Sequence, residues 1–174
     1  MTCYKTVDGF KEFTQRVTAS HFIVNKSLED QASVWFEKSS GSFHNNLQFK
    51  EQESEEVVAE MPIRYLFEGM RSDGGISQLV AHGMLCFIYF AWEKKFRPAL
   101  AEEAGVNVNN IKTDIIGDIR QLRHKIAHNL AYIDDKEAKS FKVLKWVAPG
   151  YLVLTSNDFK KIQLEINRMT VRID

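Results

Sequence analysis

Arg123 and His128 stand five residues apart in the segment IGDIRQLRHKIAHN, which spans residues 116–129. Arginine presents a planar, permanently charged group that can hold two phosphate oxygens at once. Histidine titrates near neutral pH, so it can give or take a proton under physiological conditions. RNA supplies its own nucleophile, the 2′-hydroxyl, and needs only positioning, positive charge and proton transfer to be cut. The segment therefore predicts metal-independent cleavage of an RNA backbone.

The basic residues of this segment form a local cluster in a chain with no net charge. Arg120, His124 and Lys125 join Arg123 and His128 within nine residues, whereas 23 Lys and Arg are balanced by 23 Asp and Glu overall. A neutral protein has no overall field that attracts a polyanion, so affinity for nucleic acid must come from such a cluster. We expect Arg120 and Lys125 to bind substrate beside the catalytic pair.

Residues 111–131 show the spacing of a helix with one buried face. The apolar residues that recur at helical intervals are Ile111, Ile115, Ile119, Leu122, Ile126 and Leu130. Asn109 or Asn110 is the expected N-cap. The opposite face carries the small residues Gly117 and Ala127, which allow another backbone to approach closely. This pattern predicts a homodimer through the helix of residues 109–131, in which two Arg/His sets meet in one cleft.

The rest of the chain predicts a single all-α domain over residues 1–174, with a short C-terminal β-hairpin and a terminal helix. Helices are expected at residues 5–37 (one, or two joined near Ala19 and Ser20), 55–70 with a kink at Pro62, 76–104 ending at Gly105, and 159–169 capped by residues 156–158. Residues 38–54, 72–75 and 134–135 are expected to be loops or turns. The hairpin is expected to pair residues 141–147 with 151–155.

Composition points to a reduced, cytoplasmic protein. The chain has two cysteines, Cys3 and Cys86, which do not resemble a disulfide framework, and its first residues lack the apolar core of a secretory signal. Residues 79–92 are almost wholly apolar, but this run of 14 residues is shorter than the roughly 20 that cross a bilayer. A buried helix, and no membrane partner, is the expectation.

The segment Arg123–Asn129 resembles the R-x(4–6)-H signature of HEPN domains, in which a polar residue usually follows the arginine. The preceding residues 116–120 and the aromatic and acidic stretch 89–98 also look like that family. The resemblance covers residues 76–155 in order and character, which would form a HEPN-like helical bundle. Residues 1–70, expected to be a helical extension, match no family that we can name.

The resemblance implies an all-helical fold that dimerises through the signature helices and, in many members, a metal-independent ribonuclease. Such domains serve toxin–antitoxin, abortive-infection and other defence systems, so an antitoxin or another restraining protein is an expected partner. Arg123 and His128 would be the catalytic pair, His124 would orient or assist, and Asn129 would help to bind substrate. This chain departs from the family in having His124 where Asn or Asp is frequent.

Other interpretations of the same residues stay open. The basic cluster could be an ordinary solvated helix face. Glu93 could pair with Arg97 four residues on, or stand behind the site together with Asp118. The spacing of His124 and His128 suits two zinc ligands, but Lys125 occupies the place of the metalloprotease glutamate, and no third ligand stands out. We expect no metal and no cofactor. The main alternative function is a non-catalytic HEPN-like dimer that binds a nucleotide, RNA or a protein.

Overall fold

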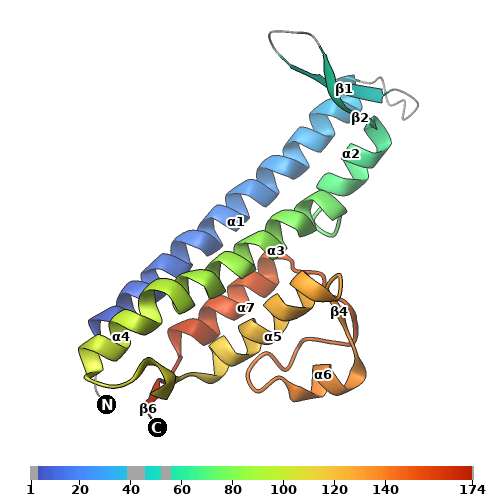
Figure 1. Cartoon of the computed structure of the whole chain (residues 1–174). Coiled ribbons are helices and arrows are strands. Elements are labelled where there is room, and N and C mark those ends of the chain that lie inside the picture. Colours follow the sequence, from blue (N-terminus) through green and yellow to red (C-terminus); the bar gives the residue numbers. More distant parts are fainter. Residues whose placement is uncertain (1–3, 39–45, 52–55, 174) are drawn as a thin grey trace. The chain divides into compact units, whose positions relative to one another are not determined.

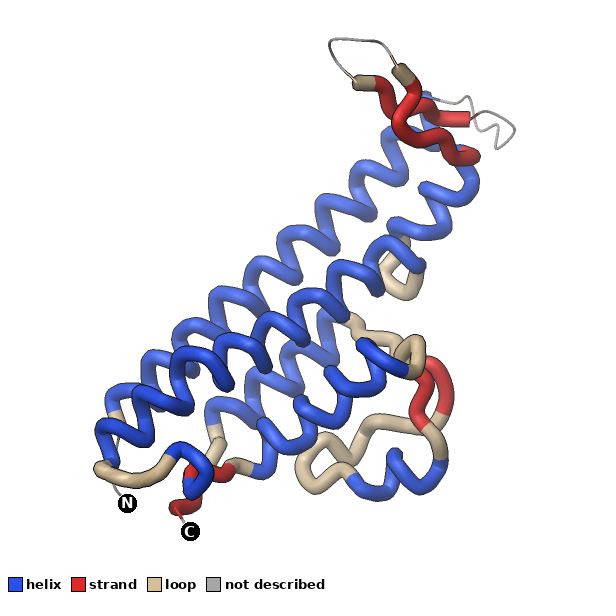
Figure 2. The backbone as a smooth tube through the Cα atoms, in the orientation of Figure 1, coloured by secondary structure: helices blue, strands red, loops and turns tan. Residues whose placement is uncertain are grey.

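The computed structural model of this chain describes residues 4–38, 46–51 and 56–173. Helices make up most of the backbone and the strands are short, which confirms the predicted mainly helical fold (Figure 2). The chain divides into two compact units: residues 1–21 with 81–174 form the first, and residues 22–80 form the second. Helices α1 (Lys5–Lys38) and α3 (Gly75–Ala91) contribute residues to both units (Figure 1).

The first unit is a helical bundle with two very small sheets. Its further helical elements are η1 (Trp92–Phe96, a π-helical turn), α4 (Arg97–Ala104), η2 (Val108–Asn110, a 3-10 turn), α5 (Asp114–His128), α6 (Asp135–Ser140) and α7 (Ser156–Asn167). Strand β3 (Ile111–Lys112) pairs antiparallel with β6 (Arg172–Ile173), and β4 (Tyr132–Ile133) pairs antiparallel with β5 (Gly150–Tyr151). The helices share one core, whose fully buried members include Phe10, Leu85, Ile119, Leu122 and Phe159.

Elements α3, η1 and α4 follow one another directly and together form the predicted helix of residues 76–104. Gly105 ends this helix in a left-handed conformation with φ of 67°, as expected of a glycine that caps a helix C-terminus. Pro98 follows directly on the π-helical turn η1, in which the N–H of Arg97 donates to the carbonyl oxygen of Trp92. By length and composition the whole stretch Gly75–Ala104 could cross a membrane. Leu85, Ile88 and Leu100 are nevertheless fully buried in the core of the first unit.

Helix α5 is the predicted signature helix, but it is shorter than residues 111–131. Its N-cap is Thr113, not Asn109 or Asn110, because Ile111 is taken up in strand β3. At the other end the helix stops at His128, and the next residue, Asn129, is the C-cap. Leu130 and Ala131 follow with positive φ angles of 49° and 63°, which no α-helix can contain.

The predicted hairpin of residues 141–147 with 151–155 is wrong. Strand β5 pairs with β4, more than a dozen residues upstream, and residues 141–147 form turns. The reason is tertiary: the backbone N–H groups of residues 142–144 donate to the carboxylate of Asp118, so they are not available to a strand partner.

Two short polar segments begin helices by the same device. Asp134, expected to lie in a turn, is the N-cap of α6, and its carboxylate and that of Glu137 each accept the other residue's backbone N–H. Thr155 and Asp158 form the same capping box at the start of α7. The predicted terminal helix is confirmed, with its start at Ser156.

Helix α1 is one continuous helix and not two helices joined near Ala19 and Ser20, so the first of the two predictions for residues 5–37 is confirmed. The prediction of a loop over residues 38–54 is wrong for residues 46–50. These residues form strand β1 (Asn46–Lys50), which pairs antiparallel with β2 (Val57–Pro62). The remainder of that loop lies mostly in residues 39–45 and 52–55, outside the described residues. The predicted helix 55–70 is confirmed only for α2 (Ile63–Met70), since the β-branched pair Val57 and Val58 favours the strand and Pro62 caps the helix.

Candidate active site

Helix α5 turns its apolar side inward and thereby exposes its basic side. Ile115, Ile119 and Leu122 are almost completely buried. Residues about half a turn away on the helix must then face outward, because successive side chains turn by about 100°. Arg120, His124 and His128 lie on that side, whereas Arg123 lies about 80° from the middle of the buried stripe, at its edge. All four side chains are exposed, and we call them the basic face.

The positive charges of the basic face have no opposite charge to neutralise them. Within the described residues, no carboxylate lies in ion-pair distance of any of its four members. Lys125, also predicted to bind substrate, differs: its ammonium forms an ion pair with Glu137 of α6, and it is only partly exposed. Lys125 therefore holds α6 against α5, and Arg120 and Arg123 are the cations left to meet a ligand.

The two histidines of the basic face lie side by side. Their ring centroids are 4.7 Å apart, and the ring planes are inclined at 47°. The four-residue spacing brings them to the same side of consecutive turns, and Arg120 precedes His124 by the same interval, so the three residues form one row along α5. A guanidinium followed by two imidazoles thus lines one edge of the exposed surface.

Arg123 and His128 do not converge within one chain. Five helical residues separate them, which leaves about 140° between their directions around the helix axis. Arg123 acts electrostatically on the thiol of Cys86 in α3: burial raises the pKa of this thiol, and the guanidinium opposes that rise. His128 instead contacts His124. A single phosphate that contacts both residues must therefore lie across the exposed side of α5, or one of the two residues must come from a second copy of the chain.

The C-terminal end of α5 is held in an unusual conformation. The N–H of Ala131 donates to the carbonyl oxygen of Lys125 at 3.0 Å, and the N–H of Tyr132 donates to that of Asn129 at 2.9 Å. These bonds require positive φ at Leu130 and Ala131, which side-chain-bearing residues rarely adopt. Asn129, predicted to bind substrate, is exposed and forms the helix cap.

Three other predicted residues lie around a polar cavity at the N-terminal half of α5. The cavity measures about 230 Å³, and Glu93, Asp118 and Arg120 are among the residues that line it. Arg123, His124 and His128 do not line it. Glu93 makes the expected ion pair with Arg97, whose Nη1 lies 3.1 Å from both carboxylate oxygens.

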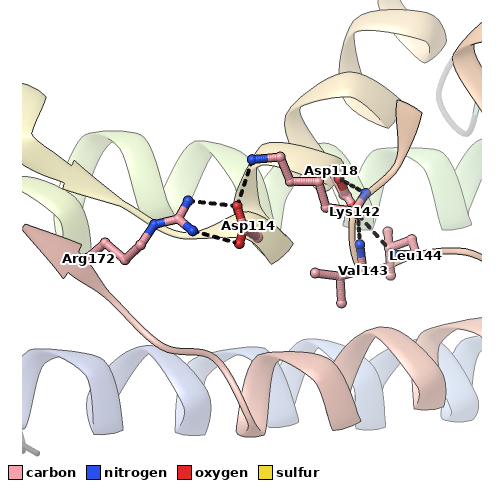
Figure 3. Close-up of polar contacts among 6 residues, drawn as sticks. All are labelled: Asp114, Asp118, Lys142, Val143, Leu144 and Arg172. Atoms are coloured by element: carbon pink, nitrogen blue, oxygen red, sulfur yellow. Dashed lines mark hydrogen bonds and ion pairs between the residues drawn. The ribbon is translucent and has the colours of Figure 1, made fainter. Parts of the chain in front are cut away.

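Asp118 has a structural task instead of a place behind the catalytic pair. Its side chain is buried, with 1% of the residue exposed. Its two oxygens accept the backbone N–H groups of Lys142, Val143 and Leu144 at 3.0, 2.6 and 2.9 Å (Figure 3). A buried carboxylate is tolerated because these donors replace water. Asp118 therefore fixes the turn of residues 142–144 against α5.

Asp114, in the first turn of α5, joins two cations from distant parts of the chain. Lys142 donates to it at 3.0 Å, and Arg172 of β6 makes a two-pronged contact at 3.0 and 2.8 Å (Figure 3). Hydrogen bonds from Lys142 and then Arg172 hold the pKa of the Asp114 carboxyl below its ordinary value. The sequence pattern did not predict this cluster, since Asp114 and Arg172 are 58 residues apart.

One observation bears on the zinc interpretation of His124 and His128. Among the described residues, no three His, Cys, Asp or Glu side chains gather as a metal site requires.

The pairing of β4 with β5 sets Tyr132 opposite Tyr151, and both rings are exposed. The sequence pattern did not predict this pair of tyrosines, because the predicted hairpin paired residue 151 with the wrong segment.

No family model matches the chain, and neither a curated protein nor a solved structure is similar enough to count as a relative.

Proposed function

We propose that this protein is a metal-independent endoribonuclease of the HEPN type. Its site is the basic face of α5, with Arg123, His128 and His124 as the catalytic residues and Arg120 as a phosphate contact. The proposal extends to the biological role: a nuclease restrained by a partner protein, such as an antitoxin, in a defence or toxin-like system. The observation that carries it is the exposed, unneutralised basic face with two imidazoles 4.7 Å apart.

The uncompensated charge argues for a ligand that is itself negative. Basic side chains on protein surfaces commonly lie near carboxylates, and on this molecule Lys142, Arg97 and Arg172 all do. Arg120 and Arg123 do not, so a phosphate would meet cations that no internal ion pair competes for. Their fixed charge also suits the extra negative charge that develops on phosphorus in the transition state.

The histidines supply the proton transfers that RNA cleavage needs. One imidazole removes the proton of the 2′-hydroxyl, whose oxygen forms a bond to the neighbouring phosphorus. The bond from phosphorus to the 5′ oxygen breaks, and a protonated imidazole donates its proton to that leaving oxygen. The products are a 2′,3′-cyclic phosphate and a 5′-hydroxyl end. Two adjacent histidines could divide these tasks between them.

A dimer would resolve the separation of Arg123 from His128. Arg123 acts on Cys86 of α3, and on that helix Phe90, four residues after Cys86, is 57% exposed. Phe87 of α3 is 51% exposed and contacts Phe13 of α1. Contacts between apolar surfaces form the centre of stable interfaces, and charged residues border them. We therefore extend the predicted dimer surface from α5 to α3, so that Arg123 of one copy and His128 of the other face a shared cleft.

The test is cleavage of single-stranded RNA in EDTA by the wild type, Arg123→Ala and His128→Ala. We expect His128→Ala to be about 10²- to 10⁴-fold slower than the wild type, the usual range for loss of a proton-transfer group. Arg123→Ala should be about 10²- to 10³-fold slower, as for loss of a group that stabilises charge in the transition state. Cyclic phosphate ends should appear in the wild-type reaction, and RNA with 2′-O-methyl groups should stay intact. Lys160→Ala, which removes an exposed cation of α7, serves as the matched control and should cleave normally.

Intact RNA at high protein excess, with wild type and variants alike, would overturn the nuclease proposal. The separation of Arg123 and His128 in one chain favours a second candidate, a dimer that binds RNA without cutting it. In that case wild type should retain labelled RNA in a gel-shift assay, Arg123→Ala should bind it less tightly, and no cyclic phosphate should form.

A further inference from the structure

Two exposed tyrosines lie side by side just beyond the end of α5. Tyr132 is 48% exposed and Tyr151 is 73% exposed, and their ring centroids are 5.3 Å apart at an interplanar angle of 76°. Backbone pairing of β4 with β5 sets the two residues opposite each other. In the described part of the chain, neither phenol hydroxyl has a hydrogen-bond partner. The rings therefore contact each other and are open to solvent.

The tyrosine pair is tied closely to the catalytic helix. Four residues separate His128 from Tyr132, and the bonds from Ala131 to Lys125 and from Tyr132 to Asn129 fold this stretch back against the last turn of α5. On the β5 side, the N–H of Leu152 donates to the carbonyl oxygen of Ala131 at 2.9 Å. The tyrosine pair therefore follows directly on the end of the helix that carries the basic face.

We propose that Tyr132 and Tyr151 form a platform on which a base of single-stranded RNA stacks while its phosphate lies on the basic face. The inference rests on the proposed function and adds how the substrate is held. Proteins that bind single strands combine a positive track for the backbone with aromatic rings for the bases. Double-stranded RNA keeps its bases stacked inside the helix, so the platform selects unpaired nucleotides.

A nucleobase fits this surface better than a protein partner does. A buried aromatic side chain contributes roughly 150–250 Å², so two rings supply far less than the roughly 800 Å² per partner of a stable protein interface. Among the nearest acidic residues, the Asp134 carboxylate accepts an N–H group at the N-terminus of α6, Glu137 is paired with Lys125, and Asp135 is exposed. The positive charges that a phosphate would meet are those of Arg120 and Arg123 on the basic face.

The test measures binding separately from cleavage. Wild type and variants are titrated with a fluorescein-labelled 2′-O-methyl oligonucleotide, which cannot be cut, and with an abasic oligonucleotide of equal length that keeps only the phosphates. We expect Tyr151→Ala to bind the first about tenfold more weakly, which is the size of one lost stacking contact. On the abasic strand the same substitution should change affinity less than twofold, whereas Arg123→Ala should weaken binding to both.

Matched variants separate stacking from other effects. Tyr151→Phe keeps the flat ring and should bind like the wild type, whereas Tyr151→Leu keeps apolar volume without a ring and should bind like Tyr151→Ala. Tyr65→Ala removes an equally exposed tyrosine, also 73%, from α2 in the second unit and should have no effect. Thermal unfolding of each variant checks that the β4–β5 pair persists.

Two results overturn the inference in different ways. If the wild type binds the oligonucleotide and Tyr151→Ala binds it equally well, the platform is wrong and the proposed function stands. If the wild type binds neither oligonucleotide, both proposals fail together. A twofold greater mass of wild type than of Tyr151→Ala in light scattering, with equal RNA affinity, would assign the rings to self-association instead.

Discussion

The two acidic residues of α5 and its basic face are used in opposite ways. Asp114 is paired with two cations and Asp118 accepts three backbone N–H groups. Arg120, Arg123 and the two histidines have no such partners among the described residues, whereas Lys125 is paired with Glu137. The acidic residues are bound into the protein, and the basic face is left for something outside it.

This difference teaches that a charged residue marks a site by its lack of compensation, not by its presence. Asp118 and Glu93 looked like parts of a catalytic arrangement in sequence. In the structure both are satisfied by neighbours, one by the turn of residues 142–144 and the other by Arg97. Compensated groups stabilise the fold, whereas uncompensated groups remain able to bind a ligand of opposite charge.

The largest effect on stability is expected from Asp118→Ala. This change leaves three N–H groups without their acceptor beside a buried position, and we expect it to lower the free energy of unfolding by about 3–5 kcal/mol. Urea denaturation measures it. Asp118→Asn keeps one acceptor oxygen, so its free energy of unfolding should lie between those of the wild type and Asp118→Ala. A loss below about 1 kcal/mol for Asp118→Ala would mean that water replaces the carboxylate and that the acidic residues and the basic face differ less than described.

Gly117→Leu tests whether a second copy covers α5. A Cβ atom at Gly117 would meet no atom within 4 Å in the described chain, Gly117 is exposed, and leucine favours helix more than glycine does, so we expect the monomer to tolerate leucine there. A partner packed on Gly117 would be overpacked by about 1–3 kcal/mol. We expect light scattering to show a reduced mass with an undiminished Tm, for this variant and for Phe90→Glu.

The matched control for the dimer test is Leu164→Glu, which changes an apolar residue of α7 that is 43% exposed. Its mass should equal that of the wild type. If Gly117→Leu and Phe90→Glu also keep the wild-type mass, α5 and α3 are not the interface.

Ala127→Glu would give the basic face a partner of opposite charge, as the acidic residue Asp114 already has. The new carboxylate stands four residues after Arg123, the spacing of a helical ion pair, and would compete with phosphate for the guanidinium. We expect RNA affinity to fall about tenfold, equivalent to roughly 1.4 kcal/mol, with little change in Tm. Ala127→Gln has the same size without the charge and disturbs packing at this face equally, so the loss in Ala127→Glu beyond that in Ala127→Gln measures the charge. Equal losses in both variants would point to a steric cause.

The smallest effect is expected from Asp114→Asn and appears only in acid. Because the cations hold the folded-state pKa below the ordinary value of 3.8, the unfolded chain takes up a proton first as the pH falls. The stabilisation is therefore complete well above pH 3.8 and is lost as the pH drops through the folded-state pKa. At neutral pH the variant should lose about 1–3 °C in Tm, and this difference should shrink toward low pH. A constant difference would show that charge is not the cause.

The local spacing of apolar residues predicted the long helices. It could not predict strands and contacts that join residues far apart in the sequence. The apolar intervals of α1, α3 and α5 were sufficient to place them, because a buried face repeats every three to four residues. Strand β1 was missed because Leu47 and Phe49 alternate within a polar stretch too short to stand out. Helix α6 was missed although its capping box, Asp134 and Glu137, was a readable signal.

The sequence predicted which residues form the candidate site. It did not predict which of their charges are neutralised or which other residues lie beside them. The sequence identified Arg120, Arg123, His124 and His128, all of which the structure exposes on one helix. It could not show which charges are neutralised, since the partners of Asp114 and Asp118 lie 24 or more residues away. It also could not show Tyr132 beside Tyr151, because that contact depends on the pairing of β4 with β5.

The left-handed residues Leu130 and Ala131 give the end of α5 a dynamic property. Each such conformation costs roughly 1–2 kcal/mol and persists only while its surroundings hold it. Local opening of β4 recovers that energy, so amide protons of residues 130–132 should exchange with solvent sooner than those in the middle of α5. Because Tyr132 is bonded to Asn129, a base that immobilises the tyrosine would also slow motion of the neighbouring His128. Binding of RNA at Tyr132 would in this way reduce the motion of His128, the residue proposed to transfer a proton during cleavage.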